Sequence, residues 1–295
     1  MMVEKKLCFA LFGKRFQDNK SMTIQKILIC LQAHNAEVYI DRRFYDYLKD
    51  TLRLKVSAAI VFDDYDFDVD FIVSVGGDGT FLRAASRVGA KNTPIVGVNT
   101  GRLGFLASVL PGEIDCAFDE IFRGDYKIEE HAVIQLSADG EPIEGVPYAL
   151  NDIAVLKRDD ASMISIRTWV NDEYLVTYQA DGVIISTPTG STAYNLSNGG
   201  PIMVPDARNL CITPVAPHSL NIRPIVINDD NSIQLEVESR SHNFLVAIDG
   251  RSEKLVEGTR LKINKAPFNI KIVKRQDQRY FSTLREKMMW GADQR

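Results

Sequence analysis

Three glycines and one aspartate stand together where a predicted strand passes into a predicted helix. The run 76–80 reads Gly-Gly-Asp-Gly-Thr; it follows the apolar run 71–75 and precedes a helical pattern over 80–88. Glycines let a backbone approach an anion closely, and the N–H groups of a helix N-terminus attract phosphate. Because Asp78 repels phosphate, its presence indicates a proton acceptor for a substrate hydroxyl, or a water-mediated metal contact. The alternative is a tight turn in which Asp78 only caps the helix.

A second polar stretch follows another apolar run, 183–186. It reads Thr-Pro-Thr-Gly-Ser-Thr-Ala-Tyr-Asn over 187–195. Hydroxyl groups and backbone N–H groups suit the oxygens of ribose and phosphate, and the ring of Tyr194 suits a base. The alternative is a polar loop between strands with Tyr194 in the core. The length of the string favours the binding turn.

The elements around the first turn predict a parallel sheet. Apolar runs at 7–12, 37–40, 71–75 and 95–98 alternate with helical patterns at 21–31, 42–54, 80–88 and 113–122. Continuous apolar strands separated by helices are typical of a parallel sheet that is covered on both faces. Residues 1–125 are therefore predicted to form a Rossmann-like α/β domain.

The pattern changes after Gly124. Runs such as 164–170 and 233–238 alternate apolar and polar residues, as half-solvated antiparallel strands do. Residues 126–274 are predicted to form a mostly-β domain, and the tail 275–295, helical from 280 to 290, is expected to pack back on the first domain. The predicted fold class is α+β overall, with two domains.

Composition and charge narrow the classes of protein. The 295 residues include 35 Lys and Arg against 39 Asp and Glu, and the net charge of -4 argues against binding nucleic acid mainly by charge. The scattered cysteines predict neither a disulfide framework nor a zinc site, and the histidines show no metal-ligand spacing. No apolar run approaches the roughly 20 residues of a membrane span, and the N-terminus lacks a signal-peptide pattern. We expect a cytoplasmic protein with neither nucleic acid nor membrane as a partner and no metal site of its own.

The Gly-Gly-Asp-Gly-Thr turn resembles the motif shared by NAD kinases, diacylglycerol and sphingosine kinases, and 6-phosphofructokinases. Further segments resemble the NAD kinases alone. They are Asn99-Thr100-Gly101-Arg102-Leu103-Gly104-Phe105, Asn151-Asp152, Asp181 to Asn195, Gly199-Gly200-Pro201-Ile202, and Pro217-His218-Ser219-Leu220 with Arg223-Pro224. Because these segments follow one another in the family's order and with natural spacing, the chain is similar to an NAD kinase.

The resemblance implies transfer of the γ-phosphoryl group of ATP to the 2′-hydroxyl of the adenosine ribose of NAD, which gives NADP. Asp78 matches the family's proton-accepting aspartate, the general base. Such a reaction needs positioning and charge neutralisation more than covalent help. A divalent cation, Mg²⁺, is expected to bridge the ATP phosphates, and the family implies a homodimer or homotetramer.

The residues assigned to substrate binding come from both turns and from the segments between them. The set is Gly76, Gly77, Asp78, Gly79, Arg83, Phe105, Asn151, Asp152, Asp181, Thr189, Gly190, Ser191, Thr192, Ala193, Tyr194 and Ala216. Asn151 and Asp152 match the pair that hydrogen-bonds adenine and ribose, although the family usually has Glu where Asp152 stands. Asp181 and Ala216 match positions that reach the nicotinamide end from a neighbouring subunit. Gln179 stands where relatives often carry Arg, so no phosphate contact is expected there.

Two of these residues have a second interpretation. Arg83, one turn into the helix, either meets phosphate or is solvated, and Phe105 packs either beside the adenine or in the core. Two other functions stay open. A lipid kinase needs an apolar acyl pocket or a membrane-facing surface, and this acidic chain shows neither. A non-catalytic dinucleotide-binding regulator gains nothing from a carboxylate beside phosphate.

Overall fold

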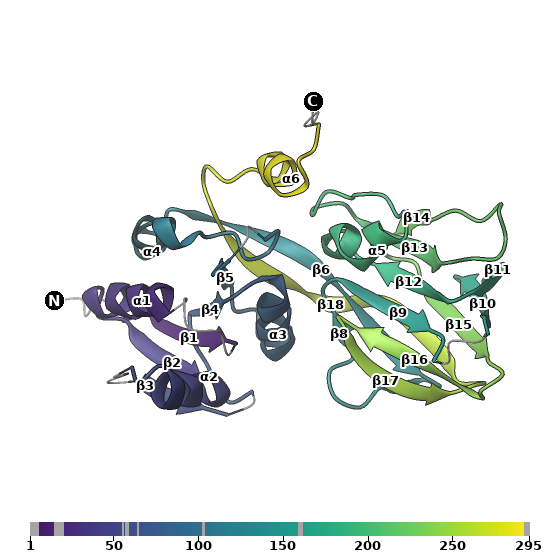
Figure 1. Ribbon diagram of the computed structural model, residues 1–295, viewed down its shortest axis with the longest axis horizontal. Helices are drawn as coiled ribbons and strands as arrows, with labels where there is room; N and C mark the ends of the chain where they lie inside the picture. Colours follow the sequence, from purple (N-terminus) through teal and green to yellow (C-terminus); the bar gives the residue numbers. More distant parts are fainter. Residues whose placement is uncertain are drawn as a thin grey trace. The chain divides into compact units, whose positions relative to one another are not determined.

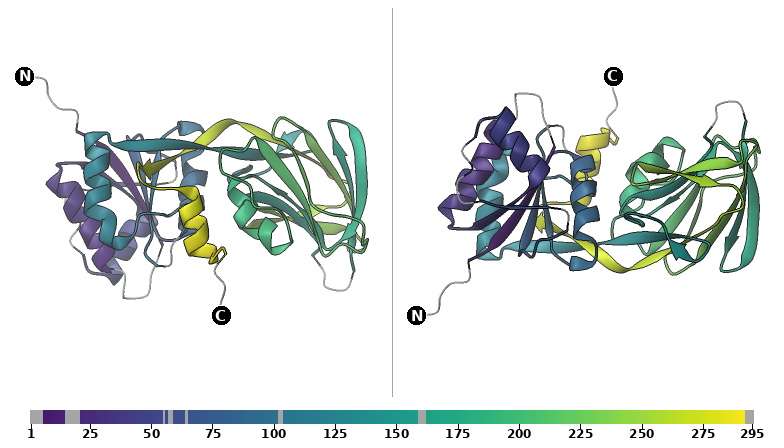
Figure 2. Two further views of the ribbon diagram at one scale, coloured as in Figure 1. Left: turned by 90° about the horizontal axis from the view of Figure 1, so that it is seen from above. Right: turned by 90° about the horizontal axis from the view of Figure 1, so that it is seen from below.

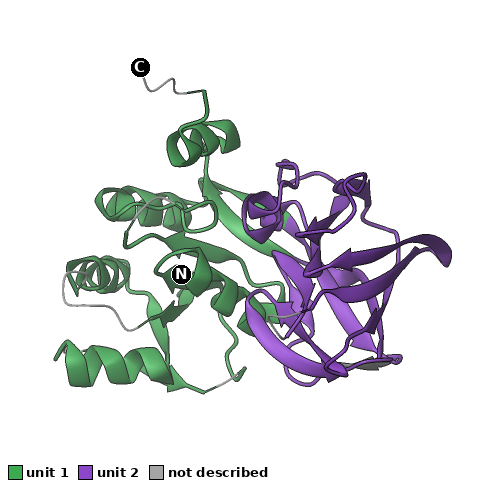
Figure 3. Ribbon diagram, turned by 45° about the vertical axis from the view of Figure 1, so that its right-hand side comes forward, with its two compact units in different colours: residues 1–130, 270–295 green, residues 131–269 purple. Residues whose placement is uncertain are grey.

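The computed structural model describes residues 6–14, 21–54, 56, 59–63, 65–101, 104–158 and 162–291. The chain divides into two compact units, residues 1–130 with 270–295, and residues 131–269 (Figure 3). Arg102 and Leu103 of the predicted family segment lie outside the described residues. No helix in the described ranges is long and apolar enough to cross a membrane.

The first unit is built on a parallel sheet (Figure 1). Its strands are β1 (Cys8–Gly13), β2 (Glu37–Asp41), β3 (Ala59–Phe62), β4 (Phe71–Val75), β5 (Ile95–Val98) and the end of β18 (Arg260–Arg275). Their order is β18-β5-β4-β1-β2-β3, and every pair in this series is parallel. All five residues of β4 are buried, as expected for a central strand covered on both faces.

Helices cover both faces of this sheet. They are α1 (Ser21–Ala33), α2 (Arg42–Asp46), α3 (Asp78–Val88) and α4 (Ile114–Arg123); a further helix, α6 (Tyr280–Met288), follows β18. Helices α1 and α4 pack together, and their apolar side chains share a core with Val96 and Val98 of β5. Gly97 lies between these two valines in the strand and therefore faces the other side of the sheet, where a Cβ added to it would contact Phe81 of α3. Helix α3 and the turn before it therefore lie on the face opposite α1 and α4.

The second unit consists of two packed sheets. One has the order β14-β13-β12-β9-β16-β17, and the other contains β11-β10-β15-β18 with β6, β7 and β8. The bounds are β6 (Tyr126–Ala138), β7 (Glu141–Pro142), β8 (Tyr148–Ala149), β9 (Asp152–Leu156), β10 (Ile164–Val170), β11 (Glu173–Ala180), β12 (Gly182–Ser186), α5 (Tyr194–Ser197), β13 (Asn209–Val215), β14 (Ile225–Asn228), β15 (Ile233–Glu238), β16 (Asn243–Ile248) and β17 (Arg251–Val256). Inward residues of both sheets form one core. The paired strands β6 and β18 each have residues in both units. Figure 2 draws the two strands side by side, β6 in teal and β18 in yellow.

The predicted fold class is confirmed, with two local differences. Residues 59–62 form β3, which the sequence pattern did not predict. The predicted helix 42–54 is instead α2 followed by a π-helical turn, Tyr47–Thr51. Burial of Phe44, Tyr47 and Leu48 gives both forms the same apolar face, so periodicity alone does not separate them.

Candidate active site

The turn between β4 and α3 has the geometry of a phosphate cradle. Gly76 has φ +155, and a Cβ there would lie 2.4 Å from the Thr80 hydroxyl, so only glycine fits. Gly77 is the N-cap of α3 and no side chain caps this helix end. Added Cβ atoms at Gly77 and Gly79 would meet nothing within 4 Å, so this side of the turn is open. The N–H groups at Gly77 and Gly79, on this open side of the helix start, are thus accessible to an anion.

The Asp78 carboxylate is held by the loop that follows β5 and by the C-terminal helix. Its Oδ1 accepts hydrogen bonds from the N–H groups of Leu106 at 3.1 Å and Ala107 at 3.0 Å. Its Oδ2 accepts from the Phe105 N–H at 3.0 Å and from Lys287 Nζ at 3.0 Å. The side chain therefore does not cap α3, and the helix-cap alternative is wrong.

The surroundings of Asp78 keep its carboxylate ionised. Burial raises its pKa, but the N–H groups of Ala107 and Phe105 and the ammonium of Lys287 outweigh burial and hold the pKa below its usual range. The side chain stays 29% exposed, so a ligand can reach it. At neutral pH this position supplies a fixed, negatively charged proton acceptor.

The close approach of Gly104 to Asp78 leads to a prediction. A Cβ at residue 104 would lie 2.1 Å from Asp78 Oδ1 and 3.0 Å from the Ala107 carbonyl oxygen. Gly104→Ala is expected to push the carboxylate off its three N–H donors and to lower kcat by about 10²-fold, the usual cost of about 1 Å of misplacement. Steady-state kinetics checks this, with Gly112→Ala as the control because its added Cβ meets nothing within 4 Å. Equal kcat for the two variants would contradict it.

In the second unit, Asp249 holds the segment that carries Asn151 and Asp152. Its carboxylate accepts hydrogen bonds from the N–H groups of Leu150 at 2.8 Å, Asn151 at 2.8 Å and Asp152 at 3.2 Å. Within the described part of the chain, Asn151 Oδ1 is buried and accepts no hydrogen bond. A buried acceptor without a donor costs free energy, so this atom is suited to an amino group on a ligand.

The Asp152 carboxyl is 7% exposed and lies near a second buried carboxylate. Burial, and then the charge of Asp249, raise the pKa of Asp152 to about 7. Burial also raises the pKa of Asp249, against the three backbone N–H groups and the charge of Arg251. Ionising both carboxyl groups at the same time therefore costs free energy.

This raised pKa makes the stability of the ligand-free protein depend on pH. The folded protein binds more protons than the unfolded chain between the ordinary pKa of an aspartate, about 4, and about 7, so the free energy of unfolding falls as the pH rises through this range. Asp152→Asn is expected to remove about 2–4 kcal/mol of this fall. Urea unfolding at pH 5 and pH 8 measures it: the variant should gain stability relative to wild type on going to pH 8. A difference independent of pH would contradict the prediction.

The predicted turn 187–195 packs directly on this segment. Thr187 donates from its hydroxyl to the Leu150 carbonyl oxygen, and its N–H donates to the Asn151 carbonyl oxygen at 2.9 Å. A Cβ on Gly190 would lie 2.1 Å from that Asn151 oxygen, so the two backbones touch where only glycine fits. The structure thus brings residues 151–152 and 187–190 together, as one site requires.

Residues of this turn have different surroundings. Ser191 is fully buried; its hydroxyl donates to the Pro188 carbonyl oxygen at 2.6 Å and accepts from the Met203 N–H at 3.0 Å, so it holds the turn in shape. Asn195 is also fully buried. Tyr194 is 38% exposed, so the alternative that places it in the core is wrong. Thr192 and Ala193 are half-buried.

The remaining residues considered in the sequence differ in their contacts and in their exposure to solvent. Thr189 Oγ1 is 2.8 Å from His131 Nδ1, and Asp181 forms an ion pair with Lys157 at 2.9 Å. Ala216 is exposed and has a left-handed backbone, φ 44. Gln179 donates to Ser165 Oγ. Arg83 is exposed on α3.

Phe105 is half-buried and contacts the C-terminal helix rather than the central core. Its ring centroid is 6.3 Å from that of Tyr280, and Lys287 Nζ lies 4.4 Å from it. Phe105 therefore does not pack in the central core.

Sequence reasoning missed three charged residues beside the predicted ones: Asp249 in the second unit, and Lys274 and Lys287 in the first. The dipeptide Asp249-Gly250 predicts a turn, and the structure has a turn there. Nothing nearby in the sequence indicates that the Asp249 carboxylate holds residues 150–152. Lys274 is 8% exposed and donates to the Phe105 carbonyl oxygen at 3.3 Å. Lys274 lies in β18, a strand that the sequence analysis did not predict, so nothing local marked this lysine. Among the described residues no group of three or more His, Cys, Asp or Glu is arranged to hold a metal ion.

Comparison with known proteins agrees with both halves of the fold. Residues 20–126 match the model of the ATP-NAD kinase N-terminal domain, and residues 150–275 match that of the ATP-NAD kinase C-terminal domain. The fold is thus that of a kinase that phosphorylates a dinucleotide. The chain belongs to the ATP-NAD kinase family.

Curated relatives and solved structures that resemble this chain agree with this family. An NAD kinase of Bacteroides fragilis is 57% identical over 97% of this chain and 99% of its own length, and one of Porphyromonas gingivalis is 41% identical over 96% and 98%. The structure of an Archaeoglobus fulgidus NAD kinase in complex with ATP matches with a TM-score of 0.70 and 26% identity, over 97% of this chain and 98% of that one. Yeast NADH kinase complexed with NADH matches with a TM-score of 0.89 and 20% identity, over 99% and 90%, which shows the fold alone.

Proposed function

We propose that this protein transfers the γ-phosphoryl group of ATP to the 2′-hydroxyl of the adenosine ribose of NAD, giving NADP. The observation that carries the proposal is the ionised Asp78 carboxylate, fixed at the open glycine turn before α3. A kinase needs an anion site and a proton acceptor close together, and this turn supplies both. The family of the chain and its close relatives support the same reaction.

Each group in the proposed site has a role that its surroundings permit. The N–H groups at the start of α3, next to Gly77 and Gly79, bind phosphate oxygens. Asp78 accepts the proton of the ribose hydroxyl as that oxygen attacks phosphorus. The unpartnered Asn151 Oδ1 accepts a hydrogen bond from the adenine amino group, and Asp152 binds a ribose hydroxyl.

ATP enters as its Mg²⁺ complex, so the cation belongs to the substrate. Mg²⁺ relies readily on phosphate and water ligands, so the ATP phosphates can hold it. We further propose a homodimer or homotetramer in which Asp181 and Ala216 contribute to a neighbouring site; the exposure of Ala216 supports this. The two compact units serve as the two domains. We also propose a cytoplasmic location, which the few, scattered cysteines of the sequence support.

The test is a direct assay. Purified protein is incubated with NAD, ATP and Mg²⁺, and NADP is measured with an NADP-specific dehydrogenase. NADP above the level of an enzyme-free blank is expected. Binding of NAD without NADP formation would indicate a non-catalytic regulator, and phosphorylation of diacylglycerol in place of NAD would indicate a lipid kinase; either outcome overturns the proposal.

A further inference from the structure

The hydrogen bonds of Asp78 leave one place for a substrate hydroxyl. An ionised carboxylate offers about four acceptor positions, two on each oxygen. Backbone N–H groups of Leu106 and Ala107 fill those on Oδ1, and the Phe105 N–H fills one on Oδ2. Lys287 Nζ, 3.0 Å from Oδ2, fills the fourth. A hydroxyl that gives its proton to Asp78 must therefore take the position that Lys287 occupies.

Lys287 is the partner of Asp78 that can leave. The three N–H groups belong to a loop whose residues Leu106 and Ala107 are buried, so they cannot move without disrupting it. The lysine side chain is 29% exposed and swings on a flexible four-carbon stem. Its ammonium also lies over the Phe105 ring, at 4.4 Å from the centroid. Lys287 thus touches two residues that the sequence assigns to substrate binding.

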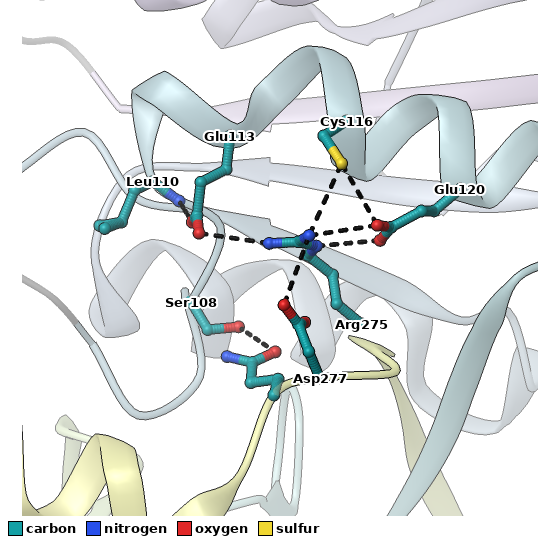
Figure 4. A network of polar contacts seen from close by, with 8 residues as sticks. Ser108, Leu110, Glu113, Cys116, Glu120, Arg275 and Asp277 are labelled. Atoms are coloured by element: carbon teal, nitrogen blue, oxygen red, sulfur yellow. Dashed lines mark hydrogen bonds and ion pairs between the residues drawn. The ribbon is translucent and has the colours of Figure 1, made fainter.

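The segment that leads to α6, the helix that carries Lys287, is anchored where it begins. Strand β18 ends at Arg275, whose guanidinium binds both carboxylate oxygens of Glu120, at 2.9 and 3.1 Å, and one of Glu113, at 3.2 Å (Figure 4). Ser108 donates to Gln278 at 3.3 Å on the way to α6 (Figure 4). This bidentate ion pair holds the base of the C-terminal segment in place.

We propose, on the basis of the proposed function, that Lys287 is a catalytic residue which moves from Asp78 to the transferring phosphoryl group when the acceptor hydroxyl binds. The hydroxyl oxygen forms its new bond to the γ-phosphorus while the bond from that phosphorus to the β–γ bridging oxygen breaks. The bridging oxygen leaves with the electron pair as part of ADP, and the hydroxyl proton passes to Asp78. An ammonium displaced from the carboxylate is then within reach of the phosphoryl oxygens, whose negative charge it neutralises.

The same exchange prepares the base. In the free enzyme Lys287 lowers the pKa of Asp78, so its departure raises that pKa and makes the carboxylate a better proton acceptor. Two further charged groups lie nearby: Lys274 of β18, which is buried and donates to the Phe105 carbonyl oxygen, and Glu129 of β6, whose charge acts on Lys274. Burial lowers the pKa of Lys274, against the charges of Glu129 and Asp78.

The experiment compares Lys287→Met with Lys287→Arg and with Arg285→Met, a control on the same helix whose side chain is exposed and bonds Ser282. Lys287→Met is expected to lower kcat by about 10²–10³-fold, as loss of one charge-stabilising donor does, while KM for NAD stays the same or falls because a competitor for Asp78 has gone. Lys287→Arg should recover part of the loss, and Arg285→Met should match wild type.

A pH profile separates this role from a structural one. The acidic limb of kcat/KM reports the free enzyme, so removing the cation raises the pKa of Asp78 and should shift the limb to higher pH. Loss of stability alone would leave the limb in place. Lys287→Met with a kcat within about threefold of wild type, a raised kcat, or an unmoved limb would overturn the inference. Absence of NADP from the wild-type enzyme would instead refute the proposed function.

Discussion

Asp78→Asn is expected to abolish most of the turnover while leaving NAD binding within a few-fold of wild type. An amide cannot accept the hydroxyl proton, and loss of a general base costs about 10²–10⁴ in rate. The amide also has only one oxygen for the three N–H groups and Lys287 that the carboxylate now binds. Kinetics of NADP formation measures kcat, and calorimetric titration with NAD measures binding.

A control separates chemistry from folding in this variant. Asp115→Asn removes an aspartate that is 66% exposed and pairs with Lys26 at the surface, so it should keep the wild-type rate. Thermal unfolding of Asp78→Asn shows whether the loop 105–107 survives. Near wild-type turnover of a folded Asp78→Asn protein would remove Asp78 from the chemistry.

Gly190→Ala is expected to produce the second large loss, in the other unit. Its Cβ would lie 2.1 Å from the Asn151 carbonyl oxygen and 2.5 Å from the carbonyl carbon, and neither backbone atom can swing aside. The turn 187–190 must separate from residues 150–152, which displaces Asn151 and Asp152. We expect kcat/KM for NAD to fall by about 10²-fold and the free energy of unfolding to fall by about 1–3 kcal/mol.

Steady-state kinetics and urea unfolding measure these two losses. Gly112→Ala, whose Cβ meets open space, again serves as the control. A Gly190→Ala protein with both kcat/KM and unfolding free energy unchanged would show that the close contact between the two segments is not required.

Local patterns in the sequence were sufficient for the class of fold and for the two turns. The apolar run Phe71–Val75, then glycines, then a helical pattern is a signal contained within about a dozen residues, and the structure forms β4, the turn and α3 there. The position of Gly76 follows the same rule, since its backbone conformation and its contact with Thr80 arise within the turn, whereas Gly190 is required by its contact with Asn151 in a distant segment. The strand β3 and the π-helical turn were missed because short apolar segments have no distinctive period.

The surroundings of the two predicted aspartates depend on tertiary structure. Asp78 binds N–H groups 27 to 29 residues away and an ammonium 209 residues away, and Asp152 lies beside Asp249, 97 residues away. Periodicity and turn signals describe neighbours within a few residues, so they cannot say which distant groups meet. The amino-acid sequence alone identified the family and predicted Asp78 as its proton acceptor; only the folded chain decided that three backbone N–H groups and Lys287 fill its carboxylate, because packing, rather than spacing, brings those donors to it.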